Sequence, residues 1–147
     1  MENNNYFKLE FDAKNINESF ARNVVAMFAG QLSPTLSEIS DIKTAVSEAV
    51  TNCVVHAYPN KVGDILLCME IENNILKISI SDFGVGIANI EEALTPFYTS
   101  KPEEERSGMG FTVMDSFMDS LVVKNNSSKG ITVEMTKGIE KTKKMAV

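Results

Sequence analysis

The chain has 147 residues, of which 44% are hydrophobic and 23% are charged, and its net charge is −6. These values are those of one ordinary globular domain and exclude a disordered or fibrous chain. The acidic balance argues against direct nucleic-acid binding, because proteins of that class need a basic surface to neutralise phosphates.

Neither a membrane segment nor a leader sequence is expected. No apolar run reaches the roughly 20 residues that a membrane span requires. The start Met1-Glu2-Asn3-Asn4-Asn5 lacks a basic region followed by an apolar one. We therefore expect a cytoplasmic protein without a membrane partner. Cys53 and Cys68 lack metal-ligand spacing and are expected to be reduced, buried thiols.

The first half of the chain predicts one strand and two helices. Tyr6 to Asp12 alternates polar and apolar residues, as a half-buried strand does. From Asn15 to Leu32 a helix is expected, with a core-facing stripe formed by Ile16, Phe20, Val24, Met27 and Phe28. Ser33-Pro34 predicts the N-cap and first turn of a second helix that continues towards Tyr58.

The second half predicts two hairpins on either side of a third helix. The strands are expected at Asp64 to Glu72, Ile75 to Asp82, Leu121 to Asn126 and Gly130 to Thr136. Asn73-Asn74 suits a two-residue turn with positive φ, and Ser107 to Ser120 has helical periodicity. Strands with one apolar face need helices on that face only. The expected fold is α+β: a two-layer α/β sandwich with about three helices on one face of an antiparallel or mixed sheet.

A single domain is expected over residues 1–137, followed by a flexible tail over residues 138–147. The stretch from Thr95 to Arg106 contains two prolines, a charged run and little periodicity. Long irregular loops are uncommon in compact domains and often serve as lids. The position of this stretch between two glycine motifs favours a lid over the simpler alternative, a solvated connection.

Glu48 and Asn52 are four residues apart on a predicted helix, so their side chains share one face. An asparagine oxygen is a hard ligand that suits Mg²⁺, and a carboxylate beside it could polarise a hydroxyl that attacks a γ-phosphate. Glu48 is therefore the candidate base and Asn52 the candidate metal ligand. Taken alone, such a pair is usually an exposed polar stripe, and the motifs downstream favour a site.

Asp82 ends an apolar strand and enters Phe83-Gly84-Val85-Gly86, where Gly84 and Gly86 permit close backbone approaches. A buried carboxylate here could accept a hydrogen bond from the amino group of adenine. Guanine presents a carbonyl at the equivalent edge, which a carboxylate would repel. A plain strand-ending turn is the alternative.

Gly108-Met109-Gly110 precedes the third helix and would place unpaired backbone amides where phosphate oxygens can bind. Ser107 could cap this helix, and Lys101 could reach a phosphate. One Gly-x-Gly is a weak signal. Three motifs in this order within residues 48–110 are hard to obtain by accident. The chain has neither a Walker loop nor a Rossmann fingerprint, so it predicts a nucleotide site of another kind.

These motifs resemble the ATP-binding superfamily of gyrase, Hsp90, histidine kinases and MutL. Asn52 matches its N box, Asp82 to Gly86 its first glycine box and Ser107 to Phe111 its second. Within it, Ser47 to Asn52, Pro96 to Lys101 and Arg106 to Phe111 are most similar to the anti-sigma F factors of spore-forming bacteria. The resemblance covers nearly the entire chain. It implies a homodimeric protein-serine kinase that uses Mg-ATP, phosphorylates a small anti-anti-sigma protein and otherwise holds a sporulation sigma factor inactive.

Carried over to this chain, the resemblance makes Glu48 the base, Asn52 the magnesium ligand and Asp82 the residue that recognises adenine. The further nucleotide-contacting residues that it implies are Gly84, Gly86, Thr99, Lys101, Ser107, Gly108, Met109 and Gly110. The implied cofactors are ATP or ADP and Mg²⁺.

Two other interpretations are open. The chain could be a non-catalytic, nucleotide-gated binding module whose acidic body docks onto a basic partner, or the detached catalytic domain of a histidine kinase. The latter is weakened because no phosphoacceptor helix pair precedes the domain, and the single histidine, His56, lies within the candidate site. Arg22, one turn from Glu18, is a candidate partner contact, and a simple ion pair between them is the alternative.

Overall fold

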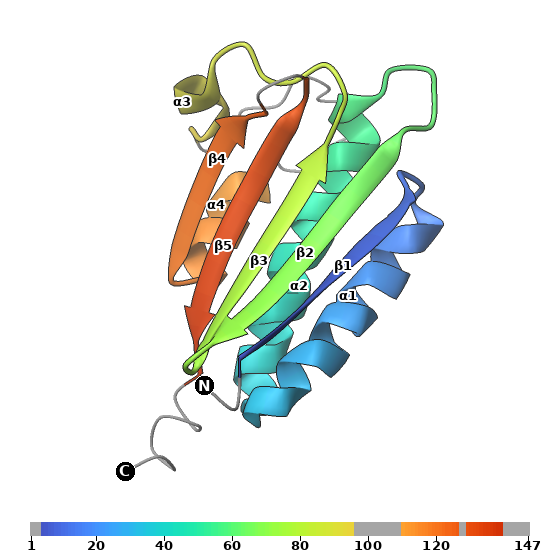
Figure 1. Cartoon of the computed structure of the whole chain (residues 1–147). Coiled ribbons are helices and arrows are strands. Elements are labelled where there is room, and N and C mark those ends of the chain that lie inside the picture. Colours follow the sequence, from blue (N-terminus) through green and yellow to red (C-terminus); the bar gives the residue numbers. More distant parts are fainter. Residues whose placement is uncertain (1–3, 96–109, 127–128, 140–147) are drawn as a thin grey trace.

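The computed structural model describes residues 4–95, 110–126 and 129–139. A five-stranded sheet lies on a layer of helices, as Figure 1 shows. The strands are β1 (Asn5–Asp12), β2 (Asp64–Glu72), β3 (Ile75–Asp82), β4 (Ser120–Asn125) and β5 (Ile131–Gly138). The helices are α1 (Ile16–Ala29), α2 (Leu36–Asn52), the short α3 (Ile90–Ala93), which was not predicted, and α4 (Gly110–Phe117). The predicted two-layer α+β fold is confirmed, and every pairing in the sheet is antiparallel.

The strand order β1-β2-β3-β5-β4 places the second hairpin directly beside the first. The first hairpin turns at Asn73 and Asn74, whose φ angles of 53° and 55° lie in the left-handed region that asparagine tolerates. In the β3–β5 pairing, Ser81 lies opposite Thr132. The end of β3, which carries Asp82, is therefore adjacent to the beginning of β5.

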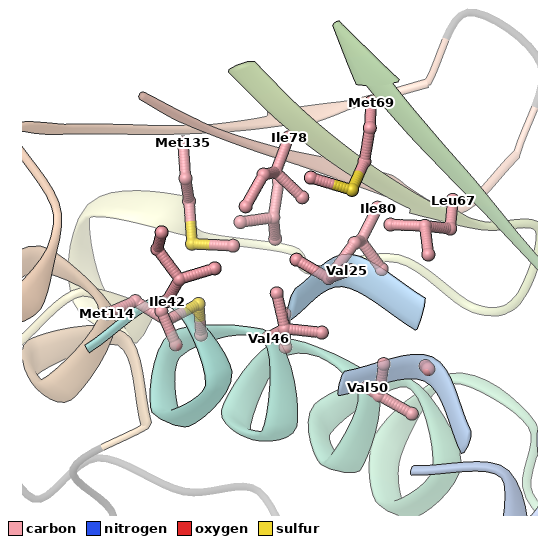
Figure 2. Packing of buried hydrophobic residues seen from close by; sticks show 14 of the residues in the cluster. Val25, Ile42, Val46, Val50, Leu67, Met69, Ile78, Ile80, Met114 and Met135 are labelled. Carbon is pink, nitrogen blue, oxygen red and sulfur yellow. The ribbon is translucent and has the colours of Figure 1, made fainter. Parts of the chain in front are cut away.

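The core lies between the inner face of the sheet and the helices (Figure 2). Alternate residues of the central strands are fully or almost fully buried: Ile65, Leu67, Met69, Ile71, Leu76, Ile78, Ile80, Val133 and Met135. Ile42, Val46 and Val50 of α2 pack against them, and each buried aliphatic side chain contributes roughly 1.5–3 kcal/mol. Because α2 also packs against α1 and α4, the orientation of its polar face is fixed.

The first helix buries a different stripe from the one predicted. Ile16, Phe20 and Met27 are exposed, whereas the fully buried residues of α1 are Ala21, Val25 and Ala29. Mostly small residues on this face let the helix backbone lie close to α2. The prediction weighted the large apolar residues, and three of the five face away from the core.

The second helix begins at Leu36 instead of Pro34. Its N-cap is Thr35, whose hydroxyl accepts the Glu38 N–H at 3.0 Å, while the Glu38 carboxylate accepts the Thr35 N–H at 2.8 Å. Such a capping box satisfies two amide donors and contributes about 1 kcal/mol. Ser33 precedes it with a left-handed φ of 52° and so cannot act as the predicted cap.

The described chain continues past the last strand. β5 runs to Gly138, and Ile139 is fully buried, with its N–H donating to the Asn74 carbonyl at 3.0 Å. Residues 140–147, which make up most of the predicted tail, lie outside the described part of the chain. Within the described ranges, no helix combines the length and the apolar character needed to cross a bilayer.

A largely buried ion pair joins β5 to two helices. Lys137 Nζ donates to the Phe117 carbonyl at 2.7 Å and lies 3.5 Å from Asp41 Oδ2 of α2. The cation thus satisfies a carbonyl at the C-terminal end of α4, where the helix dipole favours positive charge. This link holds α4 against α2 and thereby helps to set the position of Gly110 at the opposite end of α4.

Replacing Lys137 with Met should lower the free energy of unfolding by about 1–3 kcal/mol, because a carbonyl and a carboxylate lose their buried partner. Urea denaturation followed by circular dichroism measures the change. Lys124→Met is the control, because Lys124 pairs with Glu134 at 3.1 Å with its side chain 57% exposed. That change should cost less than about 1 kcal/mol. Equal losses in the two variants would contradict the role of Lys137.

Candidate nucleotide site

Glu48 and Asn52 lie on the side of α2 that meets the start of α4. A methyl group on Gly110 would lie 3.2 Å from both Oδ1 and Nδ2 of Asn52, and 3.4 Å from Glu48 Oε2. Glycine at this position therefore leaves a small cradle beside both side chains, which are half-buried. The structure brings the candidate base, the candidate metal ligand and one residue of the second glycine motif together.

The start of α4 supplies hydrogen-bond donors to the same place. The first amides of a helix have no intrahelical partner and carry the positive end of the helix dipole, so they suit phosphate oxygens. Gly110 is the first residue of this eight-residue helix. The other predicted contacts of this region, Thr99, Lys101, Ser107, Gly108 and Met109, lie outside the described residues.

The site also fits Mg²⁺ chemically. The Asn52 amide oxygen is a suitable hard ligand, and the cradle at Gly110 leaves space beside it. The described residues contain no group of three or more His, Cys, Asp or Glu side chains that could hold a metal. In nucleotide sites Mg²⁺ usually takes few protein ligands and completes its coordination with phosphate oxygens and water, so a single amide oxygen at Asn52 is compatible with it.

Asp82 is buried at the end of β3, with 2% of its surface exposed. Its Oδ1 accepts the Gly84 N–H at 3.1 Å and the Ile131 N–H at 3.2 Å. Burial raises the pKa of Asp82, and these hydrogen bonds lower it. Because a carboxylate offers about four acceptor positions, it retains capacity for a donor on a ligand.

The turn after Asp82 packs directly on the end of the α2 helical run. The Val85 N–H donates to the Ala57 carbonyl at 2.9 Å, and a side chain on Gly84 would collide with that oxygen. Gly86 has a φ of 74°, in the left-handed region. The two glycines thus serve the fold, and their predicted contacts with a nucleotide stay predictions.

Tyr58 supports this turn and was not predicted to do so. Its hydroxyl accepts the Phe83 N–H at 2.7 Å and donates to the Asp64 carbonyl at 2.6 Å. A side chain on Gly63 would collide with its ring. The sequence indicated only that Tyr58 lies at the end of a helix. No local pattern showed that its hydroxyl would bond to the first residue of β2 and to the residue that follows β3.

The β4–β5 turn supports Asp82 from the other side. Asn126 Nδ2 donates to the Asp82 carbonyl at 2.7 Å, and its side-chain oxygen accepts a hydrogen bond from the Thr132 hydroxyl. Gly130 has a φ of 90° and lies so close to Asp82 that any side chain would collide with it. The sequence indicated a turn here, but only the pairing of β5 with β3 brings it to Asp82.

The end of the α2 helical run connects the motifs. Asn52 lies against Gly110, and the next residue, Cys53, is a buried free thiol, as predicted. The same run ends at Ala57, whose carbonyl accepts the Val85 N–H of the turn that follows Asp82. Burial raises the Cys53 pKa well above its ordinary value, and the Asp82 charge adds to this rise. A π-helical turn spans Cys53–Ala57, and such turns often occur at functional sites. Cys68 is also a free thiol but is only half-buried.

A groove between α1 and α2 leads to Glu48. It is lined by Glu18, Arg22, Leu36, Ile39, Ser40, Lys43, Thr44, Ser47 and Glu48. Arg22 Nη1 lies 3.2 Å from Glu18 Oε1, so the ion pair that the sequence allowed does form. Glu48 therefore borders both a surface groove and the amide-bearing start of α4.

The sequence matches the histidine kinase-like ATPase domain family over residues 11–137. It is 56% identical over 139 residues to an anti-sigma F factor of Caldanaerobacter subterraneus subsp. tengcongensis, a match covering 95% of this chain and 97% of the relative. The anti-sigma F factor of Clostridium acetobutylicum is 55% identical over 133 residues, which cover 90% and 93% of the two chains.

Solved structures share the fold at low sequence identity. The RsbU and RsbW domains of a Mycobacterium tuberculosis protein give a TM-score of 0.67 at 18% identity, covering 92% of this chain and 32% of that chain. The catalytic domain of the histidine kinase ThkA gives 0.59 at 17% identity, covering 90% and 96%. The length of the sequence matches and the agreement in fold show that the chain belongs to the anti-sigma F factor family, within the histidine kinase-like ATPase domains.

Proposed function

We propose that the chain is an ATP-dependent protein-serine kinase and anti-sigma factor, which sequesters a sporulation sigma factor and phosphorylates an anti-anti-sigma protein. The position of Glu48 carries the proposal. Its carboxylate lies beside the start of α4 and at the end of the α1–α2 groove, so it can meet a nucleotide and a partner's side chain together. A module that only binds nucleotide and partner has no need of a base at that point.

The proposed nucleotide orientation follows from the two ends of the site. Adenine lies at Asp82, whose buried carboxylate accepts the amino group and repels the carbonyl of guanine. The phosphates lie at the start of α4, beside Asn52. When bound at Asn52, Mg²⁺ offsets phosphate charge during transfer.

Glu48 acts as the general base in this mechanism. It accepts the proton of the partner's serine hydroxyl while the serine oxygen bonds to the γ-phosphorus. The bond between that phosphorus and the bridging oxygen of ADP breaks, and ADP leaves. Glu48 is half-buried, so a hydroxyl presented from the groove can reach it.

The partner surface proposed for this chain includes Arg22, which lines the groove leading to Glu48. Its ion pair with Glu18 is only partly buried, with side chains 39% and 23% exposed, so the guanidinium can still donate to a partner. A homodimer, implied by the resemblance, is also part of the proposal. The open edge of β1 and the exposed apolar residues of α1 are surfaces that a second copy could cover.

Glu48→Gln should reduce phosphoryl transfer by about 10²–10⁴-fold with little change in ATP affinity, because the amide cannot accept the serine proton. Transfer of labelled γ-phosphate from Mg-ATP to an anti-anti-sigma protein measures the rate, and acid stability of the product distinguishes a phosphate ester such as phosphoserine from phosphohistidine. Glu70→Gln, on the exposed face of the sheet, is the matched control. Undiminished transfer by Glu48→Gln would show that Glu48 is not the base. If the wild type bound ATP without transferring phosphate, the chain would be a nucleotide-gated binding module instead of a kinase.

Asp82→Asn should weaken ATP binding. It should also lower the ratio of the GTP dissociation constant to the ATP dissociation constant by about 5- to 150-fold, the range expected when one buried polar group is mispaired. The asparagine oxygen can still accept the Gly84 and Ile131 amides, so the turn should persist. Calorimetric titration with each nucleotide gives the two dissociation constants. An unchanged ratio would show that Asp82 does not select the base.

Arg22→Ala should weaken binding of the sigma factor or the anti-anti-sigma protein by roughly tenfold, equivalent to about 1.4 kcal/mol, and leave ATP affinity unchanged. The loss follows from removing a donor that faces the groove. Surface plasmon resonance with each partner measures it, and Lys8→Ala on the exposed side of β1 is the control. If Arg22→Ala and Lys8→Ala changed partner affinity equally, the partner would not bind at Arg22.

A further inference from the structure

Asn126, in the turn between β4 and β5, faces three main-chain carbonyls with its amide nitrogen. Nδ2 lies 2.7 Å from the Asp82 carbonyl oxygen and 3.3 and 3.4 Å from those of Lys129 and Ile131. Its side-chain oxygen accepts the Thr132 hydroxyl. Because an amide nitrogen donates and an amide oxygen only accepts, these neighbours define which way the amide points. The side chain is therefore held in one orientation beside Asp82.

Two hydroxyls connect this amide to the paired part of the sheet. Thr132, which is 8% exposed, donates its single hydroxyl proton to Asn126. The Ser81 hydroxyl lies 2.8 Å from the Thr132 hydroxyl. Since Thr132 has no second proton to give, Ser81 is the donor of that bond. Ser81 and Thr132 face each other across β3 and β5, so the pairing of these strands fixes the position of Asn126.

The ladder between β3 and β5 ends at the Ser81–Thr132 pair, one residue before Asp82. Beyond this pair, a regular antiparallel ladder would continue with bonds between main-chain N–H and carbonyl groups. Here the Ile131 N–H donates to the side-chain Oδ1 of Asp82 at 3.2 Å, and the main-chain carbonyl of Asp82 accepts the Asn126 amide. Two side chains thus replace a main-chain hydrogen bond at the place where the carboxylate is held.

The carbonyl and the carboxylate of Asp82 lie beside the same stretch of backbone. A side chain on Gly130 would collide with both the carbonyl oxygen and Oδ1. Asp82 is 2% exposed, and a buried carbonyl without a donor is unfavourable. Without the Asn126 amide, the Ile131 N–H would therefore be drawn to the main-chain carbonyl and away from Oδ1.

We propose that Asn126 is a positioning residue for base recognition: by donating to the Asp82 main-chain carbonyl, it keeps the Ile131 N–H on the Asp82 carboxylate and so fixes that carboxylate to accept the amino group of adenine. The inference rests on the adenine-recognising role proposed for Asp82. Asn126 itself does not contact the base. If Oδ1 kept only the Gly84 N–H, the carboxylate could turn about its Cβ–Cγ bond, because that torsion is broad, and adenine would be distinguished less well from guanine.

The first test is Asn126→Leu in the full chain, which removes the amide and keeps a side chain of similar size. Calorimetric titration with Mg-ATP and Mg-GTP gives the selectivity, the ratio of the GTP dissociation constant to the ATP dissociation constant. This ratio should fall by about three- to tenfold, as expected for the loss of one hydrogen bond.

The hydrogen bond of the Ile131 N–H can also be followed directly, without nucleotide. In protein labelled with ¹⁵N and ¹³C, an NMR coupling across the hydrogen bond should join the Ile131 nitrogen to the Asp82 carboxyl carbon in the wild type. In Asn126→Leu this coupling should be lost, and one to the main-chain carbonyl carbon should replace it. A coupling that stays on the carboxyl carbon would overturn the proposal.

Thr132→Val tests the same network with Asn126 in place, also if Asn126→Leu does not fold. It removes the hydroxyl that holds the Asn126 oxygen, so selectivity should fall by about two- to threefold, and Thr132→Ser should restore it. Thr136→Val is the matched control, because the Thr136 hydroxyl on the same strand pairs with that of Ser120, away from Asp82. Equal losses in Thr132→Val and Thr136→Val, or no recovery in Thr132→Ser, would contradict the role of Asn126.

Asp82→Asn, measured in parallel, separates this inference from the proposed function. Selectivity that falls in Asp82→Asn but not in Asn126→Leu overturns the role of Asn126 alone. Selectivity that survives Asp82→Asn overturns both the role of Asp82 and that of Asn126.

Discussion

The candidate site depends on the tight packing of one helix, α2. α2 packs on the sheet, on α1 and on α4, so it cannot rotate without disrupting the core. Its last residue, Asn52, lies against Gly110, and the helical turn that follows it, Cys53–Ala57, accepts the Val85 N–H at the Ala57 carbonyl, just beyond Asp82. Two motifs far apart in the sequence are thereby held at fixed positions on either side of a single helical turn.

Local patterns were sufficient to predict most of the architecture. The Asn73-Asn74 turn, the period-two strands and the shared face of Glu48 and Asn52 all follow from neighbouring residues. The contacts that complete the Asp82 pocket do not. The β4–β5 turn reaches Asp82 only because β5 pairs with β3, and a strand order cannot be deduced from the residues of one strand.

The errors in the helices have an equally physical origin. In α1, the core-facing residues are mostly small because the helix lies close to its neighbours, while Ile16, Phe20 and Met27 face outward. A prediction based on hydrophobic size selects the wrong side of such a helix. At the start of α2, the reciprocal hydrogen bonds of Thr35 and Glu38 define the cap more strongly than the Ser33-Pro34 pair.

The proposed nucleotide site consists of two parts that differ in what they can distinguish. The Asp82 part is buried, and its carboxylate is held by donors of the protein itself, so it would bind the base of ATP and ADP alike. In the other part, Glu48 and Asn52 are half-buried, Gly110 is buried, and Glu48 also lines the α1–α2 groove. A ligand shifts a conformational equilibrium only through contacts that differ between states. Among the described residues, a response to the γ-phosphate is therefore expected where α2 meets α4, and Glu48 connects that place to a partner in the α1–α2 groove.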